Sequence, residues 1–114
     1  MREINPDDLD EMIENHDEPL IVDTRTAEEF AHEHIPGALH IAEGGMQNAV
    51  DPYGDQREAT LVQAGSRAIV VYSNHGIRSA AAGAVLERLG FANVYTLVGG
   101  IEQWRLAGMA VVSG

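Results

Sequence analysis

The strongest chemical signal in the chain lies in residues 70–79, Val-Val-Tyr-Ser-Asn-His-Gly-Ile-Arg-Ser. An apolar run over 68–72 ends at a short loop with one glycine and one arginine, and a helical pattern starts at Ser79. A strand, a tight loop and a helix N-terminus in this order form a cradle for an anion, because loop amides point inward and the helix adds partial positive charge. Arg78 supplies a fixed charge and a planar fork of donors. Ser73 stands where such a cradle usually presents its nucleophile.

The residues in and near the loop divide into three expected roles. Ser73 and Arg78 are the candidate catalytic residues, and Asp23 and Arg25 are expected to form a structural pair that braces the site. The candidate substrate-binding residues are the rest of the loop: Asn74, His75, Gly76, Ile77 and Ser79.

A serine hydrolase is one alternative use of Ser73. Its usual signature, Gly-x-Ser-x-Gly, is missing, since Val71 and His75 occupy the flanking positions. His75 is only two residues from Ser73 on the same loop, which is a poor place for a general base. The residues therefore disfavour hydrolase chemistry.

No metal or cofactor site is predicted. His32 and His34 are two residues apart, so on a helix they would point in different directions, and no His-x-x-x-His spacing occurs. The chain has no cysteine, which excludes disulfides, thiolate metal sites and thiol chemistry in the chain as written.

The composition is strongly acidic, with 18 Asp and Glu against 7 basic residues, all arginine, and a formal charge of -11. This balance argues against nucleic acid and anionic membrane surfaces as partners and is typical of a well-solvated surface. The first residues do not resemble a signal peptide, and no stretch approaches the ~20 apolar residues that span a bilayer. We therefore expect a cytoplasmic protein.

Strand and helix patterns alternate along the whole chain. A helix is expected to open at Asn5 with Pro6 in its first position, and Thr26 with Glu29 forms a capping-box pattern. Further helices are expected near 58–64, 79–89 and 101–106, and strands at 20–22, 38–41, 68–72 and 93–97. Residues 43–56 are expected to form a loop that has room for one turn of helix.

This alternation predicts an α/β fold: one domain over residues 1–114, with a central, mostly parallel sheet and helices on both faces. Ligands of such sheets bind beyond the carboxyl ends of the strands. Asp23, Ser73 and Gly99 all follow expected strand ends. Gly99 and Gly100 are expected to serve the backbone geometry there, and Trp104 to pack in the core.

Four separated motifs resemble the rhodanese-like domain family. Asp-Thr-Arg at 23–25 is similar to the family's Asp-x-Arg, and residues 34–38 are similar to Gly-His-Ile-Pro-Gly-Ala with Glu33 in place of the leading glycine. Residues 73–79 resemble its active-site loop, Cys-x-x-Gly-x-Arg-Ser, and residues 99–108 resemble Gly-Gly-x-x-x-Trp-x-x-Ala-Gly. The resemblance covers nearly the entire chain.

The resemblance implies sulfane-sulfur transfer, in which a loop cysteine takes sulfur from thiosulfate or a related donor as a persulfide and passes it to a thiophilic acceptor. It implies as partner a small sulfur-containing anion, or a protein that carries a thiol or persulfide. Four residues lie between Ser73 and Arg78, whereas the related phosphatases have five. The loop length therefore favours a sulfur-sized over a phosphate-sized site.

The departure from the family is Ser73 at the position of the cysteine. A hydroxyl is a weak nucleophile without an adjacent base and cannot form a persulfide, so we expect no sulfurtransferase turnover. The serine is either natural or an engineered Cys→Ser change, and the sequence does not separate the two. The alternative function is a non-catalytic module that binds an anion or a partner protein through the same cradle.

Overall fold

The computed structural model describes residues 1–42 and 44–114, apart from the side chain of Ile77. Its core is a five-stranded sheet in the order β1-β5-β4-β2-β3, in which every neighbouring pair is parallel. The strands are β1 (Arg2–Ile4), β2 (Leu20–Asp23), β3 (Leu39–His40), β4 (Ile69–Tyr72) and β5 (Val94–Leu97). The helices are α1 (Pro6–Glu14), α2 (Ala27–His32), α3 (Met46–Ala49), α4 (Ala59–Val62), α5 (Ile77–Arg88) and α6 (Gly100–Leu106).

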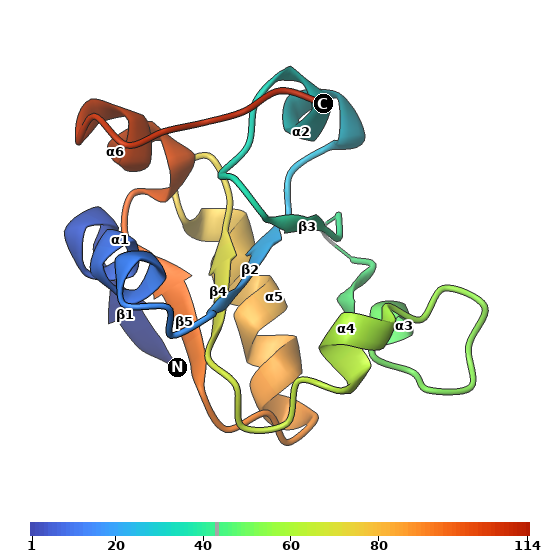
Figure 1. Ribbon diagram of the computed structural model, residues 1–114. Helices are drawn as coiled ribbons and strands as arrows, with labels where there is room; N and C mark the ends of the chain where they lie inside the picture. Colours follow the sequence, from blue (N-terminus) through green and yellow to red (C-terminus); the bar gives the residue numbers. More distant parts are fainter. Residues whose placement is uncertain (43) are drawn as a thin grey trace.

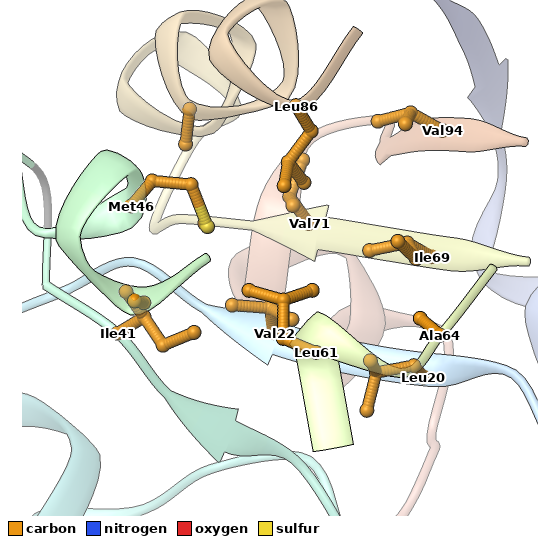
Figure 2. Packing of buried hydrophobic residues seen from close by; sticks show 12 residues of the cluster. Leu20, Val22, Ile41, Met46, Leu61, Ala64, Ile69, Val71, Leu86 and Val94 are labelled. Atoms are coloured by element: carbon orange, nitrogen blue, oxygen red, sulfur yellow. The ribbon is translucent and has the colours of Figure 1, made fainter. Parts of the chain in front are cut away.

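The sheet is covered on both faces, because successive side chains of a strand point to opposite sides. In the central strand β4, Ile69 and Val71 pack with residues of α3, α4 and α5. Val70 and Tyr72 pack on the other face with Leu9 of α1 and with residues of α6. Figure 2 shows the first of these clusters, and Figure 1 shows the arrangement of the helices. The predicted α/β class with a parallel sheet is confirmed.

The predicted helix starts follow their capping signals. The side chain of Asn5 accepts a hydrogen bond from the backbone nitrogen of Asp8 at 2.8 Å, and Pro6 opens α1. Thr26 and Glu29 form the full capping box at the start of α2. Trp104 is 2 % exposed and belongs to the core, as expected.

β3 (Leu39–His40) and α4 (Ala59–Val62) are shorter than their predicted ranges of 38–41 and 58–64. Two other differences from the sequence prediction have a clear physical reason. β1 was not expected, and it forms because its three residues pair in parallel with the edge of β5. α5 begins at Ile77 rather than at Ser79, because Gly76 adopts the left-handed conformation at φ 99° and caps the helix directly. In the expected loop at 43–56, position 43 lies outside the described residues, and α3 is a single turn of helix.

The fold brings three strand ends together. β5, β4 and β2 are adjacent in the sheet, so their carboxyl ends meet at one edge. Asp23 ends β2, Ser73 follows β4, and Gly99 lies just past β5. The connection from β4 into α5, seen at the end of β4 in Figure 1, is therefore at the sheet edge where ligands of parallel sheets bind.

Candidate functional site

Ser73 forms the floor of the cradle. The residue is 1 % exposed, and its Oγ accepts a hydrogen bond of 2.9 Å from the backbone nitrogen of Gly76. A hollow of about 250 Å³ opens above it and is lined by Ser73, Asn74, His75 and Arg78. The first backbone N–H groups of a helix have no partner within the helix, so the start of α5 turns donors towards this hollow. The hollow thus has the Ser73 hydroxyl at its floor and the Arg78 guanidinium among its lining groups.

The first residues of α6 hold the loop in place. The backbone nitrogens of Ile101 and Glu102 donate to the carbonyl oxygens of Ser73 at 3.0 Å and Asn74 at 3.3 Å. This approach needs glycine at position 100, where φ is 62° and a Cβ would collide with the backbone of Ser73 and Asn74. These contacts with α6 fix the backbone of Ser73 and Asn74 at the start of the loop.

A buried ion pair supports the cradle from below. The Arg25 guanidinium, in a residue 4 % exposed, binds both carboxylate oxygens of Asp23, with its closest contact at 2.8 Å. It also donates to the carbonyl oxygen of Glu33 at 2.5 Å and to Oδ1 of Asn74 at 3.4 Å. Burial alone would lower the pKa of Arg25, but the hydrogen bonds and charge of Asp23 outweigh burial and raise it. The pair therefore links β2, the segment after α2 and the cradle loop.

Tyr72 completes this support. Its ring is fully buried, and its hydroxyl accepts a hydrogen bond from the backbone nitrogen of Ile35 at 3.1 Å. Burial, together with the charge of Asp23, raises the pKa of Tyr72 well above its ordinary value. The phenol is therefore a neutral structural group directly before Ser73.

The basic side chains at the rim each lie beside a carboxylate. Arg78 Nη2 lies 3.6 Å from Oε1 of Glu29, and the Arg78 side chain is 35 % exposed. His75 Nδ1 lies 3.0 Å from Oε2 of Glu102, with the imidazole 68 % exposed. Arg78 also lines an adjoining hollow of about 230 Å³ together with Thr24, Arg25, Thr26 and Ala42. Arg78 can thus contact a ligand in either hollow.

Glu29 is a site residue that sequence reasoning missed. Its Oε2 accepts a hydrogen bond of 2.5 Å from Nδ2 of Asn74, and its Oε1 accepts one of 3.1 Å from the backbone nitrogen of Thr26. These hydrogen bonds, from Asn74 first, lower the pKa of Glu29 to about 2. The sequence shows Glu29 only as part of a capping box, and nothing local indicates a contact with a residue 45 positions away.

The predicted loop residues take different positions in the structure. Asn74, His75 and Arg78 line the hollow, and Gly76 contributes its N–H. Ser79 is fully buried and its hydroxyl donates to the carbonyl oxygen of Gly76 at 3.0 Å, so it fastens the loop from within. The side chain of Ile77 lies outside the described residues.

The geometry gives no support to a hydrolase. Within the described part of the chain, no hydrogen bond joins Ser73 to a histidine or carboxylate side chain, and the hydrogen bond described above reaches Ser73 from a backbone amide. His75 instead contacts Glu102 on α6. Activation of a serine requires a base within hydrogen-bond reach, and the loop does not provide one.

Two further properties concern the described residues only. Within 1–42 and 44–114, no group of three or more His, Cys, Asp or Glu side chains is placed to hold a metal ion. In the same part of the chain, no helix combines the length and apolar character needed to cross a membrane.

Comparison with known sequences gives one consistent family. The model of the Rhodanese-like domain matches residues 5–107. A curated relative, thiosulfate sulfurtransferase GlpE of Actinobacillus succinogenes, is 30% identical over 107 residues, which cover 94% of this chain and 86% of the relative.

Solved structures agree with the fold. A rhodanese-related protein from Thermoplasma volcanium is 27% identical, covers both chains completely and superposes with a TM-score of 0.77. A Rhodopseudomonas palustris protein of unknown function, described as a possible tyrosine phosphatase, has a TM-score of 0.87 at 24% identity. The match covers 98% of this chain and 85% of the Rhodopseudomonas palustris chain, and at this identity it shows only that the two share a fold.

Proposed function

The chain belongs to the rhodanese-like domain family, and on this premise we propose that its cradle is a sulfane-sulfur transfer site whose nucleophile position is held by Ser73. The chain as written binds a small sulfur-containing anion, or a partner protein that carries a thiol or persulfide, and does not transfer the sulfur. The activity in the name of the Actinobacillus succinogenes relative supports thiosulfate as a donor for the active form of such a site.

The reaction explains why the cradle has this shape. A thiolate at the floor attacks the outer sulfur of thiosulfate, a new S–S bond forms, and sulfite leaves with the electron pair of the broken S–S bond. An acceptor such as cyanide then attacks the outer sulfur of the persulfide, thiocyanate forms, and the thiolate is released. Inward amides and a helix N-terminus favour the thiolate over the thiol and also stabilise the persulfide anion.

Serine removes the chemistry and keeps the shape. A hydroxyl has nearly the size of a thiol, but it stays protonated without a base and has little affinity for sulfur. The hydrogen bond from Gly76 to the Oγ of Ser73 is the observation that carries the proposal, because it shows the loop closed around the nucleophile position. Arg78 at the rim provides the charge that would orient an anionic donor.

A thiosulfate:cyanide assay at high enzyme concentration tests the proposal. We expect no turnover by the chain or by Ser73→Ala, and clear turnover by Ser73→Cys. Turnover by the chain that disappears in Ser73→Ala would overturn the proposed inactivity. An inactive Ser73→Cys that is folded and binds thiosulfate would overturn the assignment of the cradle to sulfur transfer.

A purely binding function is the second candidate. It is favoured by the intact loop around Ser73, in which Gly76, Ser79 and Arg78 keep the contacts that shape an anion site. In that case thiosulfate binds measurably to the chain as written, as in the first proposal, but Ser73→Cys transfers no sulfur. The physiological ligand is then a sulfur anion or a protein surface that presents one.

A further inference from the structure

Each described basic side chain of the cradle has a carboxylate neighbour. The pairs are Arg78 with Glu29 at 3.6 Å, His75 with Glu102 at 3.0 Å, and Arg25 with Asp23 at 2.8 Å. The charges of each arginine and its carboxylate cancel, in a chain whose formal charge is already -11. These arginine pairs therefore offer a doubly charged anion no net positive charge.

Glu29 is the carboxylate best placed to influence a ligand. Its carboxylate contacts two residues that line the hollow, Asn74 and Arg78, whereas the contact given for the Glu102 carboxylate is with His75. The capping box fixes the position of Glu29, since Thr26 donates to it from both its backbone nitrogen and its hydroxyl, each at 3.1 Å. Its negative charge is therefore held beside the hollow.

We propose, resting on the proposed sulfur site, that Glu29 is a specificity-determining residue that selects against doubly charged anions. Through its ion pair with Arg78 and its hydrogen bond with Asn74, it makes the cradle favour ligands with at most one negative charge. Organic thiols and persulfides belong to this class, because their sulfur carries one negative charge when ionised. Inorganic dianions such as thiosulfate and sulfate still bind, but more weakly than they would with a neutral residue at position 29.

The physical argument is one of charge. A fixed carboxylate opposes a dianion about twice as strongly as a monoanion at the same position, since the Coulomb energy scales with the ligand charge. The Glu29 carboxylate also neutralises part of the positive charge that Arg78 would otherwise offer to a ligand. The pKa of Glu29, lowered to about 2, keeps this carboxylate ionised throughout the neutral range.

The test compares Glu29→Gln with the unchanged chain and with Glu28→Gln. Glutamine preserves the capping box through its single amide oxygen, while its amide nitrogen takes the place of the oxygen that accepts from Asn74. The variant therefore removes the charge and this one hydrogen bond but keeps the size of the side chain and the helix cap. Glu28 is an exposed neighbour on the same helix turn and controls for the loss of one charge. The probes are thiosulfate as dianion and thiocyanate as monoanion, titrated at constant ionic strength and followed by the amide NMR signals of residues 74–79.

We expect Glu29→Gln to raise thiosulfate affinity about tenfold and thiocyanate affinity about threefold, and Glu28→Gln to change neither by more than about twofold. A similar gain of about tenfold is expected in kcat/KM for thiosulfate when Glu29→Gln is combined with Ser73→Cys. The inference is overturned if Glu29→Gln gains no affinity, if it gains equally for both anions, or if Glu28→Gln gains as much. None of these results affects the proposed sulfur site. Absence of binding by the chain and both variants overturns the binding site itself.

Discussion

The Oγ of Ser73 lies 2.9 Å from the backbone nitrogen of Gly76, which donates a hydrogen bond to it. This one contact closes the loop between β4 and α5 on the side chain at its floor. A thiolate in the same place would accept the same hydrogen bond and would be stabilised as the anion.

Arg78 supplies the charge that an anion meets at the rim. We expect Arg78→Ala to lower thiosulfate affinity about tenfold, because one unit charge beside a dianion is lost. Isothermal titration calorimetry measures the effect. Arg88→Ala is the matched control, since Arg88 lies at the other end of the same helix. An equal loss in both variants would show that the effect comes from net charge and not from the cradle.

Gly100 allows α6 to approach the loop. We expect Gly100→Ala to lower the free energy of unfolding by about 3 kcal/mol or more, because it adds left-handed strain and a collision with the backbone of Ser73 and Asn74. Gly37→Ala, also at positive φ but with open space around it, isolates the strain and should cost about 1 kcal/mol. Urea unfolding measures both. Equal losses would mean that close packing at Gly100 contributes little.

Tyr72 satisfies a buried backbone donor. We expect Tyr72→Phe to lower the free energy of unfolding by about 1–3 kcal/mol, because the N–H of Ile35 then loses its acceptor. Tyr53→Phe, at a residue 94 % exposed, should change it by less than about 0.5 kcal/mol. Denaturant midpoints compare the two. A Tyr72→Phe variant as stable as the chain would contradict the structural role given to the hydroxyl.

The pKa of Glu29 predicts a pH dependence of stability. Its folded pKa of about 2 lies below the ordinary value of 4.5, so its ionised form stabilises the fold above pH 4.5 and this contribution is lost as pH falls towards 2. We expect Glu29→Gln to be less stable than the chain at pH 6, because it lacks the ionised carboxylate. The loss should not exceed about 1 kcal/mol, because solvent screens the partly exposed side chain. The difference should vanish near pH 2. If the urea midpoints of the chain and of Glu29→Gln differ as much near pH 2 as at pH 6, the prediction is contradicted.

Much of the site could be predicted because its determinants are local. The apolar run of β4, the glycine and arginine of the loop and the helix that follows are contiguous in sequence, so the cradle follows from neighbouring residues. Asp23 and Arg25 are two residues apart, and their pairing needs only the end of one strand. The capping signals at Asn5 and Thr26 are local for the same reason.

The parts that could not be predicted depend on contacts between distant residues. β1 is three residues long and exists only because β5 offers it an edge. Glu29 meets Asn74 across 45 positions, and α6 reaches the loop carbonyls only after the sheet has formed. The start of α5 at Ile77 depends on the φ of Gly76, which no apolar periodicity reveals.

Mass spectrometry of Ser73→Cys after incubation with thiosulfate tests the central claim most directly. The chain has no cysteine of its own, so this variant has a single thiol and any persulfide must lie at position 73. We predict a mass gain of one sulfur atom in Ser73→Cys, removed by cyanide, and no gain in the unchanged chain. A folded Ser73→Cys protein that gains no sulfur at any thiosulfate concentration would contradict the account.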